Sequence, residues 1–191
     1  FACGESVLAV NICEDIWVPT GPTIAQSLAG AELVVTINGS PYHAGKGHVR
    51  EQMVAAQAAD NLVCLAFVNS VGGQDELVFD GQSFIVNETG KCVARGRAFE
   101  EDLVVADMDL AQVFRARLDD PRWREGKGHE SAEALRVELS PLASRHQPPL
   151  PQREIPRYDQ VEEIYHALVL GARDYVRKNG FSRAVVGLSG G

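Results

Sequence analysis

The sequence predicts an α/β fold that begins with a parallel sheet. Apolar runs typical of buried strands alternate with helical spacing, the strands being expected at 6–12, 33–38 and 62–69 and the helices at 22–30 and 47–61. Continuous apolar strands separated by helices favour a parallel sheet covered on both faces. Shorter strands joined by glycine and polar turns then indicate antiparallel pairing, at 82–86, 91–95 and 102–107.

The ends of the expected helices carry suitable residues. Pro22 fits the first turn of the first helix, and Gly30 fits its C-terminal end. The second helix has apolar residues at helical spacing, at Val49, Met53, Ala56 and Ala59. A further helix is expected at 109–118, with Asp109 as its N-cap.

The second half of the chain divides into a linker and a new α/β unit. Periodicity is lost after residue 118, and prolines interrupt the chain at Pro121, Pro141, Pro148, Pro149, Pro151 and Pro156. A helix is expected at 159–179, capped by Gly180, and then a strand at 183–188. The predicted organisation is therefore a first domain at 1–118, a surface linker at 119–157 and the start of a second domain at 158–191.

Composition excludes several classes of protein. The chain has 191 residues, 45% of them hydrophobic, and a formal net charge of −8, which argues against a nucleic-acid or anionic-membrane partner. No apolar run is long enough to span a bilayer, and no secretory signal pattern is visible. The four cysteines form no C-x-x-C pair, so free thiols in a reducing cytoplasm are expected and a metal site is not.

A cysteine follows the first expected strand. Cys13 comes after the apolar run 7–10 and precedes Glu14 and Asp15. The turn after a parallel strand exposes a side chain and points backbone N–H groups at one spot, as a nucleophile needs. The two carboxylates oppose formation of the thiolate, so a cation must come from elsewhere in the fold. A structural cysteine at a strand end remains the alternative.

Three motifs in order carry a family resemblance, at 11–17, 38–42 and 69–83. Together they resemble the nitrilase superfamily, specifically the glutamine-amidase domain of glutamine-dependent NAD synthetases. The resemblance implies part of an α-β-β-α sandwich. It also implies that the cysteine attacks the side-chain amide of glutamine, forms a thioester, releases ammonia and then releases glutamate.

Residue roles follow from the resemblance by position. Cys13 would be the nucleophile, the backbone N–H of Glu14 an oxyanion donor, and the Glu14 side chain and Ser40 ligands of the amino-acid end of glutamine. Lys46 would lie near the substrate carboxylate. Without the resemblance, Ser40 would be interpreted as a turn residue before Pro41. His43 and His48 read as surface or lid residues rather than metal ligands, because no third ligand has plausible spacing.

The family's catalytic Glu and Lys come from strands before the cysteine, whereas only twelve residues precede Cys13. We therefore expect the chain to be a fragment with no glutaminase activity by itself.

The C-terminal residues carry a second resemblance. The glycine-rich stretch Gly187, Leu188, Ser189, Gly190 and Gly191 resembles the S-G-G-x-D-S loop of the ATP-pyrophosphatase fold, whose backbone N–H groups wrap pyrophosphate. It implies ATP with Mg²⁺, adenylation of deamido-NAD and attack by ammonia. The partners implied for the intact enzyme are glutamine, ATP, deamido-NAD and, by family analogy, further copies of itself.

Two alternatives remain open at this point. A stand-alone nitrilase-type amidase would act on another small amide or nitrile, but the C-terminal stretch argues against it. A non-catalytic scaffold or an inactive fragment is the other. An Asp-Ser pair one residue after Gly191 in the gene would favour the synthetase.

Overall fold

The computed structural model describes residues 1–123, 125, 135–140, 148, 150, 153–155 and 157–190. Within this part of the chain, a seven-stranded mixed sheet has the order β8-β7-β4-β3-β2-β1-β9. Its centre is parallel and consists of β2 (Ser6–Ile12), β3 (Leu33–Asn38) and β4 (Cys64–Asn69). The predicted strands 6–12 and 33–38 are confirmed, and the third begins two residues later than expected.

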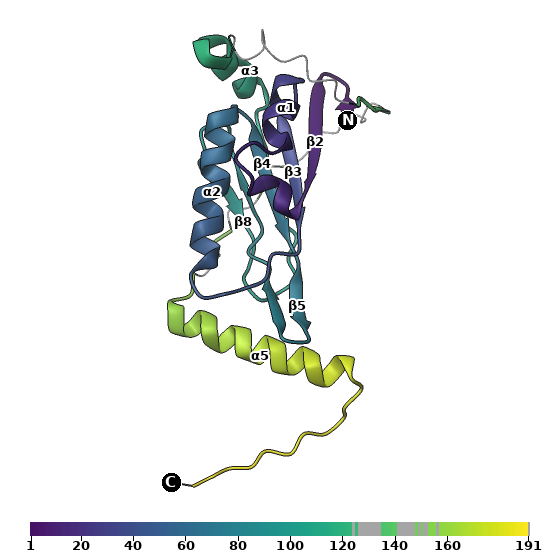
Figure 1. The fold of residues 1–191 in the computed structure, drawn as a ribbon, viewed down its shortest axis with the longest axis vertical. Coiled ribbons are helices and arrows are strands. Elements are labelled where there is room, and N and C mark those ends of the chain that lie inside the picture. Colours follow the sequence, from purple (N-terminus) through teal and green to yellow (C-terminus); the bar gives the residue numbers. More distant parts are fainter. Residues whose placement is uncertain are drawn as a thin grey trace.

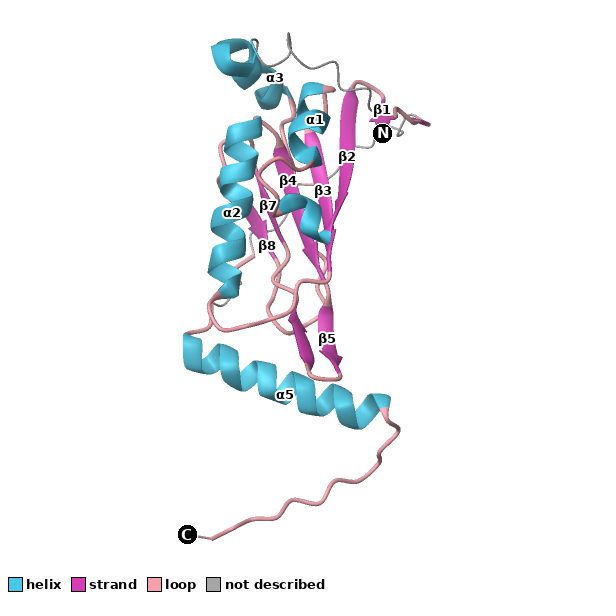
Figure 2. Ribbon diagram, in the orientation of Figure 1, coloured by secondary structure: helices cyan, strands magenta, loops and turns pink. Residues whose placement is uncertain are grey.

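Helices cover one face of this sheet. They are the short 3-10 helix η1 (Cys13–Ile16), α1 (Pro22–Leu28) and α2 (Lys46–Asn61), shown in front of and beside the strands in Figures 1 and 2. Beneath them lies a cluster of buried residues that we call the sheet core: Ile16, Val34, Val54, Ala58, Val63, Leu65, Phe67, Phe84 and Val86. Phe67 and Phe84 stack with ring centroids 5.2 Å apart.

The opposite face of the sheet is open in the described part of the chain. Its apolar side chains are 39% to 60% exposed at Val10, Ile12, Ile37 and Val68. The expected cover on both faces is therefore wrong for the described residues. The alternation of buried and exposed positions along β3 shows that only one face has a layer to pack against.

An antiparallel extension follows the parallel strands. β7 (Phe84–Val86) pairs with β4 and with β8 (Cys92–Arg95), and the predicted turn is stabilised by Asn87, whose Oδ1 accepts from the N–H of Lys91 at 2.9 Å. A separate hairpin of β5 (Val71–Gln74) and β6 (Leu77–Asp80) was not predicted.

The expected strand at 102–107 is wrong. These residues have no strand partner among the described residues, and Leu103 is 79% exposed. Arg153 instead binds this segment, donating to the Leu103 carbonyl at 2.9 Å and to the Asp102 carboxylate. Asp102 and Leu103 are thus held by an arginine side chain from the linker and not by strand pairing.

Helix α3 (Ala111–Asp119) confirms the helix expected at 109–118, but its N-cap is Leu110 and not the expected Asp109. Asp109 Oδ1 accepts from the N–H of Ala111 at 3.1 Å. The short strand β9 (Glu138–Leu139) lies in the predicted linker and pairs with β1 (Ala2–Cys3) at the sheet edge. None of the described helices is long and apolar enough to cross a membrane.

Helix α5 (Gln160–Lys178) lies across the β5–β6 hairpin (Figure 1). Its N-cap Asp159 accepts from the N–H groups of Val161 and Glu162, which confirms the expected helix start. The helix completes a second buried cluster, which we call the hairpin core: Phe99, Ala167 and Leu170, with Tyr42, Val71, Val78, Ala98 and Tyr158 packed against it.

The expected strand at 183–188 is also wrong. Residues 181–190 are extended but have no strand partner in the described part of the chain, and Val185 is fully exposed. A strand needs a neighbour for its N–H and C=O groups. Gly191 lies outside the described residues.

Candidate active site

Cys13 lies at the carboxyl end of β2 with an unusual backbone. Its φ is +47°, in the left-handed region, where a non-glycine residue costs about 1–3 kcal/mol and is concentrated at functional sites. The thiol is half-buried. The carboxylate of Asp15 stabilises the turn by accepting from the N–H of Ile12 at 2.8 Å. The thiol therefore lies at a sharp strand-to-helix turn. The Asp15 side chain is hydrogen-bonded to the backbone of this turn, whereas the Glu14 side chain is exposed.

Lys46 brings a positive charge to this turn. It is the first residue of α2, and its Nζ donates to the Pro41 carbonyl at 3.0 Å and lies 5.8 Å from the centroid of the Trp17 ring. Burial lowers the pKa of Lys46, and Arg50 lowers it further, whereas Asp80, Cys13 and Glu14 raise it. Lys46 therefore interacts electrostatically with Cys13 and Glu14. It is a candidate for the cation that the sequence predicts from another part of the fold.

Ser40 is buried, with 3% of its surface exposed. Its N–H donates to Asn69 Oδ1 at 2.9 Å, and its Oγ accepts from Arg50 Nε at 3.2 Å. Within the part of the chain that the structure describes, the Ser40 O–H has no hydrogen-bond acceptor. The motif that contains Ser40 therefore forms a rigid turn at the carboxyl end of β3, next to the end of β4.

Sequence reasoning missed the ion pair beneath this turn. Arg50 Nη1 and Asp80 Oδ2 are 2.9 Å apart, and the two side chains are 1% and 0% exposed. The apolar face predicted for the second helix had the wrong phase, because Val49 is 49% exposed. The residues of α2 that are buried are Arg50, Val54, Ala58 and Asn61. Arg50 lies four residues before Val54, so the two side chains share one face of the helix, and this spacing could have predicted that Arg50 is buried.

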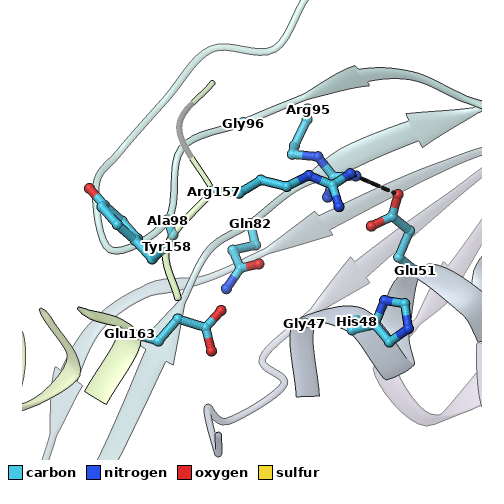
Figure 3. A pocket seen from close by; sticks show the side chains of 10 residues that line it. All are labelled: Gly47, His48, Glu51, Gln82, Arg95, Gly96, Ala98, Arg157, Tyr158 and Glu163. Atoms are coloured by element: carbon cyan, nitrogen blue, oxygen red, sulfur yellow. Dashed lines mark hydrogen bonds and ion pairs between the residues drawn. The ribbon is translucent and has the colours of Figure 1, made fainter. Parts of the chain in front are cut away.

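A cavity of about 150 Å³ is lined by Glu51, Gln82 and Arg95, among other residues (Figure 3). Glu51 pairs with Arg95 there and lies 3.8 Å from Arg157, and His48 lines the same cavity. Gln82 joins the cavity to the ion pair, since its Nε2 donates to Asp80 Oδ2 at 2.9 Å. Cys13 is not among the lining residues, so the cavity and the thiol are separate features.

The glycine-rich stretch does not meet the thiol in this structure. Its described residues 187–190 are extended and exposed, and a Cβ atom at Gly187 or Gly190 would meet nothing within 4 Å. His43 is exposed, as expected for a surface or lid residue. In the described ranges, no group of three His, Cys, Asp or Glu side chains is arranged to hold a metal ion.

Comparisons with known proteins point to one family. The family model for carbon-nitrogen hydrolases matches residues 1–118. The chain is 48% identical over 185 residues to the glutamine-dependent NAD(+) synthetase of Aquifex aeolicus, covering 96% of this chain and 32% of that protein. It is 43% identical over 195 residues to the synthetase of the same name from Thermotoga maritima, covering 98% and 32%.

Solved structures agree with this result. The glutamine-dependent NAD+ synthetase of Acinetobacter baumannii in complex with ADP matches with a TM-score of 0.67 and 30% identity, over 95% of this chain and 28% of that one. A carbon-nitrogen hydrolase from Helicobacter pylori shares the fold, with a TM-score of 0.58, 22% identity and coverage of 64% and 46%. The chain spans about a third of the length of the curated relatives it matches. Its sequence and fold, a partial nitrilase-type α/β domain with a cysteine at a strand end, place the chain in the carbon-nitrogen hydrolase family.

Proposed function

We propose that the chain supplies the amidase site of a glutamine-hydrolysing NAD synthetase. The observation that carries this proposal is Cys13, whose left-handed backbone presents a half-buried thiol at the end of a parallel strand. The relatives named as glutamine-dependent NAD(+) synthetases cover nearly the whole chain, including the residues after 118. That extent of similarity favours the synthetase over a stand-alone hydrolase.

In the proposed reaction the sulfur of Cys13 attacks the side-chain carbonyl carbon of glutamine. The backbone N–H of Glu14 donates to the oxyanion that forms on the carbonyl oxygen. The C–N bond then breaks, the amide nitrogen takes up the proton that the Cys13 thiol has lost and leaves as ammonia, and a thioester remains on the sulfur. Water attacks the thioester and releases glutamate and the free thiol.

Substrate recognition is assigned to the residues that surround this turn. The exposed carboxylate of Glu14 suits the amino group of glutamine, and Lys46 suits its carboxylate, because each offers the opposite charge. The Ser40 hydroxyl keeps its proton free to donate, since Arg50 uses only its acceptor side. In the family that the motifs resemble, the general base and a further lysine precede the cysteine in sequence.

We infer a second chemistry for the intact enzyme. Ammonia from the thiol site would amidate deamido-NAD after its activation by ATP, with Mg²⁺ as the accompanying ion. Residues 187–191 would wrap the phosphates through backbone N–H groups, in a domain that begins near 158 after the linker 119–157. The ADP bound to the Acinetobacter baumannii synthetase supports nucleotide use by such an enzyme. A cytoplasmic homo-oligomer without nucleic-acid or membrane partners completes the proposal.

The test uses the full-length protein with glutamine, ATP and deamido-NAD. We expect Cys13→Ala to reduce glutamine-dependent NAD formation at least about a thousandfold. NAD formation from added ammonia should persist, because ammonia bypasses the thiol. Cys92→Ala is the matched control, since Cys92 is also a free, half-buried thiol.

Labelling with a glutamine-analogue electrophile then identifies the nucleophile by mass spectrometry. Modification of Cys64 or Cys92 in place of Cys13 would overturn the assignment. Turnover of another amide or nitrile without turnover of glutamine would favour the stand-alone hydrolase.

A further inference from the structure

We propose that Arg50 is a positioning residue for glutamine recognition, because it holds the turn that carries Ser40 and the carbonyl that binds Lys46. This inference rests on the function proposed above. It concerns a buried arginine that lies beneath the recognition residues and is not itself expected to touch the substrate.

The guanidinium of Arg50 makes three hydrogen bonds to one short segment, Ser40 and Pro41. Its Nε donates to Ser40 Oγ at 3.2 Å, and its Nη2 donates to the carbonyls of Ser40 at 3.2 Å and Pro41 at 3.1 Å. Its Nη1 donates to Asp80 Oδ2 at 2.9 Å. Because the planar guanidinium presents its donors at fixed angles, these contacts set the position and orientation of the Ser40–Pro41 peptide.

Asp80 and Asn69 fix the arginine and the turn from the other side. Asn69 Oδ1 accepts from the Ser40 N–H at 2.9 Å, and Asn69 Nδ2 donates to the Ser40 carbonyl at 3.3 Å. Asp80 accepts from Gln82 at 2.9 Å in addition to Arg50. The backbone N–H, the carbonyl and the hydroxyl of Ser40 are therefore all bound by buried side chains.

The same network reaches Lys46. The Pro41 carbonyl accepts from Arg50 Nη2 at 3.1 Å and from Lys46 Nζ at 3.0 Å, so two cations share one acceptor. A displacement of this peptide would move the Lys46 ammonium as well as the Ser40 hydroxyl. Arg50 thus controls two of the groups assigned to glutamine, in addition to directing the Ser40 proton away from itself.

A purely structural role is the competing explanation. Asp80 is fully buried, and a buried carboxylate needs a partner, so Arg50 could serve only to neutralise it. The two roles differ when both charges are removed together. Replacement of the pair by neutral groups restores folding in either case, but only a structural role would also restore glutamine binding.

The experiment compares four variants of the full-length protein: Arg50→Met, Arg50→Lys, the double variant Arg50→Met/Asp80→Asn, and the control Arg97→Met. The Arg97–Glu100 pair is a suitable control because both side chains are 56% exposed. Each variant is assayed for glutamine KM and kcat, for ammonia-dependent NAD formation, and for alkylation of Cys13 by iodoacetamide and by a glutamine-analogue electrophile.

We expect the double variant to fold and to raise the glutamine KM about tenfold to a hundredfold, the loss typical of charge-assisted hydrogen bonds, while kcat changes far less. Labelling by the glutamine analogue should slow by a similar factor, whereas labelling by iodoacetamide and ammonia-dependent activity should not change. Arg50→Lys should recover part of the loss, because lysine keeps the charge without the fixed geometry.

A double variant with wild-type KM would overturn the proposal, even if Arg50→Met alone fails to fold. An equal loss of both alkylation rates would also overturn it, because the thiol itself would then be disturbed. A wild-type protein that does not consume glutamine would instead refute the proposed function, which separates the two failures.

Discussion

The sheet core and the hairpin core are built in different ways. The sheet core uses strands and helices that follow one another along the chain, from Ile16 to Val86. The hairpin core joins β5 and β6 to a helix that lies about a hundred residues later, through Gly73 and Asp174 among others. The difference shows that the first cluster follows from local pattern, whereas the second requires a close approach between distant segments.

Two glycines make that approach possible. A Cβ atom at Gly73 would lie 2.9 Å from the Cα of Gly171, closer than side chains normally come to backbone. Asp174 Oδ2 accepts from the Gly73 N–H at 2.8 Å, and Lys178 Nζ donates to the Gly73 carbonyl at 2.6 Å. The helix that pattern assigns to a second domain therefore packs tightly on the hairpin of the first.

The hairpin core also reaches the site. Tyr42 packs edge-on against Phe99 with ring centroids 5.4 Å apart, and its N–H donates to the Val78 carbonyl at 2.7 Å. Tyr42 lies two residues after Ser40 in the same motif. The turn held by Arg50 is thus connected to the hairpin core through Tyr42.

The largest effect is expected in the sheet core. Phe67→Ala should destabilise the protein by about 3–5 kcal/mol, because it removes a fully buried ring that stacks on Phe84. Hydrogen exchange measured by mass spectrometry in the full-length protein should quicken across β2, β3 and β4. Leu103→Ala, at a 79% exposed position, is the control. Faster exchange confined to α5 would contradict the separation of the two cores.

A smaller and more local effect is expected in the hairpin core. Gly73→Ala places a methyl group against the backbone of Gly171 and should cost about 1–3 kcal/mol. The same exchange measurement should show α5 losing protection while β3 and β4 keep theirs. Gly187→Ala adds the same atom in open space and should change little. Unchanged protection of α5 in Gly73→Ala would show that the close approach does not limit docking.

Alkaline pH tests the buried thiol of Cys64, the first residue of β4. Burial raises the pKa of Cys64 from 9.0 to about 11. The unfolded chain therefore loses this proton first, and stability contributed by the neutral thiol falls as pH rises from 9 towards 11, by about 1 kcal/mol per pH unit. The difference in urea midpoint between wild type and Cys64→Ala should shrink over that range. A difference that stays constant with pH would exclude this titration.

The smallest effect concerns the polar contact of α5. Asp174→Ala removes the acceptor of the Gly73 N–H and should weaken the docking of the helix by about 1 kcal/mol. Exchange at α5 should quicken less than in Gly73→Ala. Glu76→Ala, on the exposed tip of the same hairpin, should leave α5 unchanged. An effect of equal size in Glu76→Ala would indicate general loss of charge rather than the specific contact.

Sequence pattern was sufficient for the parallel strands, because each is a continuous apolar run and pairs with the next such run along the chain, as β2 does with β3. Sequence pattern failed for β5, because Gly72 and Gly73 lower strand propensity. These glycines allow close contact with helix α5, which is distant in sequence. The pattern also failed for 183–188, an apolar run without a partner strand in the described residues.

The site divides in the same way. The position of Cys13 at a strand end could be predicted, because the strand and the cysteine are contiguous. The pairing of Arg50 with Asp80 could not, since it crosses thirty positions and joins a helix to a hairpin. The proximity of Lys46 to Cys13 likewise depends on how α2 starts over the sheet.

The left-handed backbone of Cys13 makes the residue needed for glutamine turnover differ from the residue that would give the greatest stability. Glycine would occupy this conformation without a steric penalty, so Cys13→Gly removes both the thiol and the local strain. A directed-evolution screen for heat resistance alone would tend to discard the cysteine, whereas a screen for glutamine turnover would retain it. The codon at position 13 would therefore show which selection was applied, since cysteine indicates selection for activity and glycine indicates selection for stability.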